Sequence, residues 1–295
     1  MFEIIRHELA IALRTKRALL TLALYVTAAL IGSLAYIFAV RLIESQAIDV
    51  MVRNGAPLDE ARRSFSLLGT EGYAQMVAFF AGTEQGALSP LIRDSLILPA
   101  LMWGSLAFLP FLIVLASYDQ LASDLATRSL CYSVLRASRR NLVLGKFAAQ
   151  ALLFGLALLL SALCLFGLAA LMLGSFDPAL ALLGIGRAWL LLVAYGSCYL
   201  GLSALASASV RQPVMALFLA LGAMVGLRMV GWLGSLPESS AYAILRPLRW
   251  LSPSAYQSGL WEAGYAAPLA SAGAYLAMGA LFVGLAVWTL EARDL

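Results

Sequence analysis

Six long apolar runs, separated by shorter polar segments, dominate the pattern of the chain. An α-helix rises ~1.5 Å per residue, so about 20 apolar residues cross the hydrocarbon core of a bilayer. The strands of a membrane barrel would instead alternate apolar and polar residues over about ten positions. The pattern therefore predicts an all-α polytopic membrane protein with six transmembrane helices. The predicted spans are residues 19–40, 96–117, 147–173, 188–209, 214–233 and 269–290.

The first run follows the basic stretch RTKR, as a cleaved signal peptide would. It is too long for a signal sequence, however, and no small-residue cleavage pattern follows "YIFAV". We therefore interpret residues 19–40 as a permanent span. Together the spans form a single transmembrane domain over residues 1–295.

The basic residues indicate which side of the membrane each connection occupies. With an even number of spans, both termini share one side with the connection 118–146. Lys and Arg are more than twice as dense there as in the opposite connections, 41–95, 174–187 and 234–268. The positive-inside rule then assigns both termini to the cytoplasm, and we expect a bacterial inner-membrane protein. The net charge of +4 reflects this topology and contact with anionic lipid, not nucleic-acid binding.

The N-terminal residues 1–18 carry an amphipathic pattern. Apolar residues fall on one arc at the spacing of a helix, and charged residues fall on the next arc. The pattern predicts a helix that lies on the membrane surface. Its apolar arc consists of Phe2, Ile5, Leu9, Ala12 and Leu13.

Two of the outer connections have structure of their own. In 41–95, Asp59 suggests the start of a helix, and the length of this loop fits either a functional segment or a simple cap. The pattern of 234–268 predicts two short half-helices, with Trp250 and Trp261 at the level of the lipid headgroups.

Chemical motifs are mostly missing. His7 is the single histidine, and no GxSxG motif occurs. The GxxxxGK[ST] phosphate loop needs glycine where Arg140 stands and Ser or Thr where Phe147 stands. We expect no catalytic site, metal or cofactor in this chain, so ATP and Mg²⁺ would belong to a partner protein.

The spans contain one clear charge and one clear small-residue motif. Arg228 stands near the outer end of the fifth span, where snorkelling toward the headgroups is favoured over contact with a substrate. The spans hold no carboxylate, which argues against an ion-coupled carrier. Gly222 and Gly226 form a GxxxG motif that favours close contact with a second helix, and we expect a dimer interface there.

The connection 118–146 begins with the pattern of an amphipathic helix. Tyr118, Leu121, Leu125 and Tyr132 share one face, and basic residues gather near the end. The stretch 118–147 resembles the cytoplasmic segment after the second span in membrane subunits of type-2 ABC exporters. Arg128 and Ala137 depart from that family's pattern, which often has glycine and proline there. The residues that fit are Asp119, Asp124, Leu130, Leu135, Ser138, Arg139, Gly145 and Lys146.

The resemblance extends along the chain. Residues 2–17 are similar to the family's elbow helix, 234–268 to its outer half-helices, and the tail "WTLEARDL" to its C-terminus. It implies a permease subunit that pairs with a second permease copy and with two cytoplasmic ATPase subunits. The residues implied to couple the ATPase are Asp119, Leu121, Asp124, Leu125, Arg128, Leu130, Tyr132, Leu135 and Arg139.

Alternatives to this interpretation remain. Arg140 suits lipid headgroups or capping of the loop end, whereas Arg139 suits a structural or an ATPase contact. A membrane scaffold or sensor could share the fold, dock an outer accessory protein on 41–95 and transport nothing. An intramembrane enzyme ranks last, because the predicted spans contain no group of polar side chains that could form an active site. The sequence does not identify a substrate.

Single-cysteine labelling tests the orientation. In a chain whose native cysteines are replaced by alanine, Glu60→Cys should react with an impermeant reagent from outside, and Ser138→Cys only from inside. The reverse result would contradict the predicted topology.

Nucleotide binding provides an independent test. Because the chain has no phosphate loop, the purified chain alone should not bind ATP specifically in equilibrium dialysis. Micromolar affinity for ATP would contradict the prediction that only a partner ATPase binds the nucleotide.

Overall fold

A computed structural model describes residues 2–14, 17–55, 57–58, 70–93, 95–127, 138–172, 178–235 and 243–293. Within these ranges the fold is helical, with one isolated β-bridge and no named strand. Six of the helices are long and apolar enough to cross a membrane, which confirms the predicted fold class. They are α2 (Arg17–Arg53), α6 (Ile97–Ser117), α9 (Arg139–Met172), α10 (Pro178–Ser209), α11 (Pro213–Leu233) and α12 (Ala266–Glu291).

Several helices run beyond the predicted spans. α2 continues to Arg53, well into the predicted outer connection. The turn that follows contains Gly55, whose φ of 95° suits glycine. α9 begins at Arg139, so Lys146 belongs to a long helix and not to a loop. The reason is that hydropathy marks where the membrane ends, whereas a helix continues until a residue breaks it.

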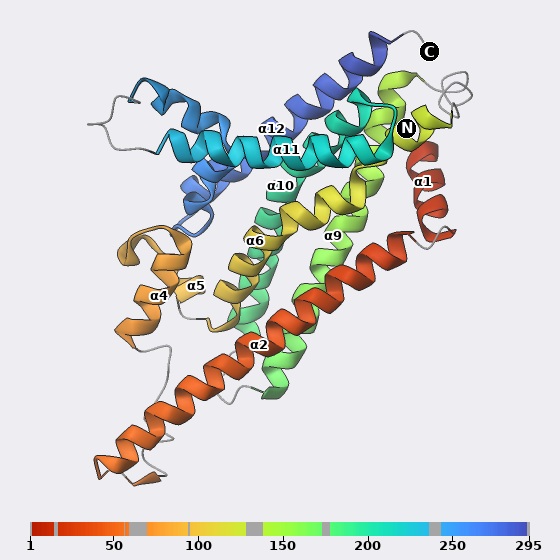
Figure 1. The fold of residues 1–295 in the computed structure, drawn as a ribbon. Helices are drawn as coiled ribbons and strands as arrows, with labels where there is room; N and C mark the ends of the chain where they lie inside the picture. The colour runs from red at the N-terminus through yellow and green to blue at the C-terminus, as the bar shows by residue number, and fades with distance from the viewer. Residues whose placement is uncertain are drawn as a thin grey trace.

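The helix α10 stands at the centre of the bundle. It packs against α6, α9, α11 and, most extensively, α12. Both chain ends lie at the same end of the bundle, beside the start of α9 (Figure 1). In contrast, α2 leaves the bundle at its far end (Figure 1).

Two glycines let α10 and α12 approach closely. A Cβ on Gly201 would lie 2.6 Å from the carbonyl oxygen of Gly279, and a Cβ on Gly279 would lie 2.8 Å from that of Ser197. Backbone atoms cannot move aside cheaply, so only glycine fits at this crossing. Such contacts are a common way to pack helices in membranes, where lipid removes the hydrophobic drive for helix association.

Short helices cover the outer end, opposite the termini. The first connection contributes α4 (Glu71–Ala81), η2 (Gln85–Ala87) and α5 (Pro90–Arg93). The last contributes η3 (Ala243–Leu251), η4 (Pro253–Tyr256) and η5 (Ser258–Leu260), in place of the two predicted half-helices. The helix start predicted at Asp59 lies outside the described residues.

The two outer connections are joined to each other. Leu88 pairs with Glu262 in the β-bridge, and the amide of Ser89 donates to the carbonyl of Trp261 over 2.9 Å. Arg187 of α10 adds hydrogen bonds to the carbonyls of Glu262 and Gly264. Trp261 is consequently only 1% exposed and packs inside the protein.

Tyrosines anchor the last connection deep in the bundle. The hydroxyl of Tyr275 donates to the carbonyl of Pro253 over 2.8 Å, and Gln257 donates its amide to the hydroxyl of Tyr195 over 3.2 Å. Tyr195 in turn donates to the carbonyl of Leu106 in α6. Irregular backbone at membrane depth needs protein partners of this kind, because lipid offers none.

A pair of glycine substitutions in α12 tests the helix crossing. Gly279→Ala should lower the thermal midpoint of the purified protein by about 2–6 °C, because overpacking forces α10 and α12 apart. Gly284→Ala, in the same helix with open space around it, should not. Equal midpoints for both variants, measured by fluorescence-detected melting, would contradict the crossing.

Candidate functional site

Five helices meet at the end of the bundle that holds both termini, and we call this region the junction. They are the short α1 (Phe2–Arg14) and α7 (Ala122–Ala126), the first turns of α9, and the last turns of α10 and α12. The junction has an apolar core separate from that of the bundle. It consists of Leu121, Leu125, Leu142, Val143, Ala204, Ala208, Val283, Ala286 and Leu290.

The structure corrects the prediction for the segment after the second span. Residues 118–121 form a turn, and α7 has only five residues. Leu121 and Leu125 are 1% and 7% exposed and pack inside the chain. They therefore cannot offer an apolar face to a partner protein, because contact with Leu142 and Val143 already removes that surface from water.

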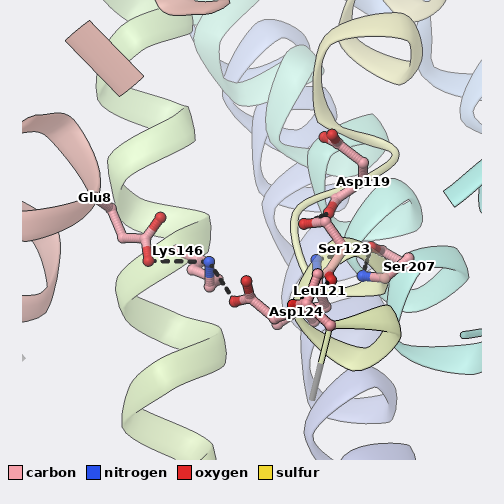
Figure 2. A network of polar contacts seen from close by, with 9 residues as sticks. Glu8, Asp119, Leu121, Ser123, Asp124, Lys146 and Ser207 are labelled. Carbon is pink, nitrogen blue, oxygen red and sulfur yellow. Dashed lines mark hydrogen bonds and ion pairs between the residues drawn. The ribbon is translucent and has the colours of Figure 1, made fainter. Parts of the chain in front are cut away.

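A serine of α10 holds the start of α7. The hydroxyl oxygen of Ser207 accepts hydrogen bonds from the amides of Leu121 and Ala122, each over 2.9 Å (Figure 2). The first amides of a helix have no partner within it, and in a buried position they need one. Ahead of α7, the carbonyl of Asp119 accepts from the amide and the hydroxyl of Ser123. The contacts of Ser207 fix α7 against α10, and those of Asp119 close the turn that precedes α7.

An ion-pair network links α1, α7 and α9. The ammonium group of Lys146 lies 2.9 Å from a carboxylate oxygen of Glu8 and 3.0 Å from one of Asp124 (Figure 2). Lys146 is 9% exposed, and removing one partner of a buried pair leaves an uncompensated charge. The network therefore adds ion pairs to the apolar contacts that join these three elements.

The helix α1 lies directly on α9. A Cβ on Gly145 would be 2.6 Å from the Cγ2 atom of Ile4, so glycine is needed for this approach. Ile5 and Leu9 of the predicted arc are half-buried. Phe2 and Leu13 lie in the helix, but their side chains are outside the described part of the structure.

Arginines cap the ends of three long helices. Arg139 donates from one guanidinium nitrogen to the carbonyls of Leu290, Glu291 and Arg293, at 2.8–3.1 Å, where α12 ends. Arg293 donates to the carbonyl of Ser209 at the end of α10, and Arg41 of α2 donates to that of Met172 at the end of α9. Cations at these positions satisfy unpaired carbonyls and complement the helix dipole. Arg139 thus has a structural contact, while the neighbouring Arg140 is exposed.

The remaining predicted residues are not brought into the junction. Gly222 and Gly226 are exposed on α11, and a Cβ at either would meet no atom within 4 Å. Arg228 is exposed on the same helix and lines a cavity. Four predicted coupling residues lie outside the described residues: Arg128, Leu130, Tyr132 and Leu135.

Sequence reasoning missed two residues of the junction. Glu8 belongs to no motif, and Ser207 stands out only as a small residue four positions after Ser203. A lysine beside a glycine at the start of an apolar helix could have raised the question of which carboxylates face it. Within the described ranges, no group of three or more His, Cys, Asp or Glu side chains could hold a metal ion.

Comparison with known proteins identifies one family. The sequence profile of a family described as ABC-2 family transporter protein matches residues 2–295. No curated protein matches the chain.

Two adjacent arginines test the capping of α12. Arg139→Gln should raise the hydrogen-exchange rate of the amides at 287–293 by about tenfold, since hydrogen bonds to a charged group contribute about 1.5 kcal/mol or more. Arg140→Gln removes the same charge from an exposed neighbour and should leave the rates unchanged. If both variants exchange alike, Arg139 does not cap the helix.

Proposed function

Because the chain belongs to the ABC-2 family of transporter proteins over residues 2–295, we propose that it is the membrane subunit of an ATP-binding cassette exporter. The family and the six apolar helices support a multi-pass membrane permease of an ABC transporter. Two copies of the chain form the transport path, and two separate ATPase subunits drive it. The junction then faces the cytoplasm of a bacterial cell, and ATP and Mg²⁺ bind only in the ATPase.

The observation that carries the proposal is the position of Lys146 between Glu8 and Asp124. A soluble ATPase must act on the spans through parts of the chain outside the membrane. Either α1 or α7 could receive that movement, and the ion pairs connect both to the first turns of α9. Displacing α1 or α7 without α9 would separate a buried charge from its partners, which is costly. This link supports a coupling role for the junction.

The exposed residues of the junction define where an ATPase would bind. On α1 these include Arg6 and His7, and at the end of α7 they are Ala126 and Thr127. The buried Leu121 and Leu125 act instead as positioning residues, because they hold α7 on the bundle from inside. In this proposal the ATPase contacts a polar and basic surface and not an apolar groove.

The exposed glycines of α11 support the proposed dimer. Gly222 and Gly226 lie one turn apart on one face, with no side chain of this chain against them. Small residues with this spacing allow two helix backbones to approach closely in a membrane. A second copy of α11, related by two-fold symmetry, would complete such a contact.

An outer aromatic patch favours the second candidate, a scaffold that docks an accessory protein. Phe79 and Phe80 of α4 are 81% and 46% exposed, and the ring of Phe80 lies 5.1 Å from that of Trp103. Exposed aromatic groups of this kind are typical of interaction surfaces or of the headgroup region. ATP-dependent transport by vesicles that contain only the permease and its ATPase would exclude a role confined to docking.

Removal of the central lysine tests the coupling. Lys146→Gln leaves Glu8 and Asp124 close together without a cation, at a cost of about 3 kcal/mol, the lower end of the range for a buried pair. The spans should still insert. Co-purification of a partner ATPase that binds the unmodified chain, or its stimulation by the permease, should fall at least tenfold.

Two further variants make this test decisive. Arg211→Gln removes an exposed cation from the turn between α10 and α11 and should bind and stimulate the ATPase normally. Asp124→Asn keeps one of the two ion pairs and should give an intermediate loss. Full stimulation by Lys146→Gln would show that the junction is not the coupling path, whereas failure of the unmodified chain to bind any ATPase would contradict the transporter assignment itself.

A further inference from the structure

A cavity of about 590 Å³ lies between α6, α10, α11 and η4. This volume is in the range of sites that hold small organic ligands. Most of its wall is apolar, and Phe111, Met229 and Trp232, each at least half exposed, lie around it. The cavity therefore combines an apolar wall with side chains that reach the surface of the bundle, where lipid chains would be.

One charge stands in the cavity wall. Arg228 is the only charged side chain among the described lining residues, and no carboxylate lines the cavity with it. A guanidinium group is never neutral in a protein. In a membrane it needs an anion or water, and an apolar cavity that exposes it therefore favours an anionic ligand.

Two hydroxyl groups lie next to the same position. The Oγ atoms of Ser252 and Ser254 are 2.8 Å apart, and both would collide with a side chain on Gly231. Gly231 follows Arg228 by three residues and so shares its face of α11. Because Gly231 has no side chain, Ser252 and Ser254 can lie against the face of α11 that carries Arg228.

From this arrangement we infer that the cavity binds an anionic phospholipid from the bilayer. The phosphate accepts hydrogen bonds from Arg228 and from the hydroxyl of Ser254, which the fully buried Ser252 holds in place. An acyl chain lies against Phe111, Met229 and Trp232. Arg228 precedes the end of α11 by five residues, or about 8 Å along the axis, which is close to the headgroups. The inference needs the chain to sit in a membrane, but it does not rest on coupling to an ATPase.

The proposed dimer contact leaves Arg228 free. Successive residues of a helix are about 100° apart around its axis, so Gly226 and Arg228 are about 200° apart and face different sides of α11. Met229, which also lines the cavity, follows Gly226 by three residues and lies close to the GxxxG face. A second copy that packs on Gly222 and Gly226 would therefore lie beside the apolar part of the cavity without covering Arg228.

Native mass spectrometry of the full chain tests the site. The probes are phosphatidylglycerol and phosphatidylcholine with the same acyl chains. The unmodified protein should retain its most tightly held phosphatidylglycerol at least tenfold better than phosphatidylcholine. Arg228→Gln should remove this preference, because it deletes the charge-assisted hydrogen bonds. Arg211→Gln, which removes an equal charge elsewhere, should keep it.

Two more measurements separate the alternatives. Ser254→Ala, a change too small to disturb folding, should weaken phosphatidylglycerol binding severalfold. Millimolar inorganic phosphate should not displace the lipid, because the acyl chain contributes to binding; displacement would mean a site for a free anion. If Arg228→Gln retains phosphatidylglycerol as the unmodified protein does, Arg228 only snorkels to the headgroups and the inference is wrong.

Discussion

A charge cannot be buried at the end of a membrane-crossing helix without partners, and this constraint organises the end of the bundle that holds both termini. Lys146 lies in α9 with carboxylates on two sides, one from α1 and one from α7. The short α7 is held by its buried Leu121 and Leu125 and by Ser207, and α1 packs on α9 at the edge of the bundle. The single ammonium group adds an ion pair to each of the two helices and so links both to α9. The close approach of Ile4 to Gly145, one residue before Lys146, brings α1 near enough for the ion pair to form.

The backbone at a helix end also needs partners, because its last carbonyls have none within the helix. The last carbonyls of α9, α10 and α12 accept hydrogen bonds from Arg41, Arg293 and Arg139. Charged residues make up only 12% of the chain, and these three stand where carbonyls have no partner within their own helix. The basic cluster that begins at Arg136 in the sequence is therefore more than a topology signal. Its one half-buried member in the described residues, Arg139, joins the start of the third span to the end of the sixth.

The sequence was enough to predict the fold class, because apolar runs of about 20 residues match the thickness of a bilayer and exceed what a core helix of a soluble domain needs. Residues 118–147 also carried the pattern of the ABC-2 family. The sequence could not predict which way Leu121 and Leu125 face, because an amphipathic pattern does not say whether the apolar side meets a partner or the same chain. Nor could it predict the Gly201–Gly279 crossing, since Gly222 and Gly226 have the better motif and yet no other helix of the described residues packs closely on them. Contacts such as Glu8 with Lys146 span more than a hundred residues and depend on the packing itself.

The two ends of the bundle are connected through α10. Its outer part carries Arg187, which holds the last outer connection, and its other end carries Ser207, which holds α7. Gly201 locks it to α12 between those points, so α10 and α12 form one rigid unit with a contact at each end. In contrast, α11 buries only Ala216, Ala220, Met224 and Gly231, and it forms one wall of the cavity that contains Arg228. Since the other walls belong to α6, α10 and η4, the position of α11 sets the width of the cavity. The helix that carries Arg228 thus forms a wall of the cavity while burying few of its own residues.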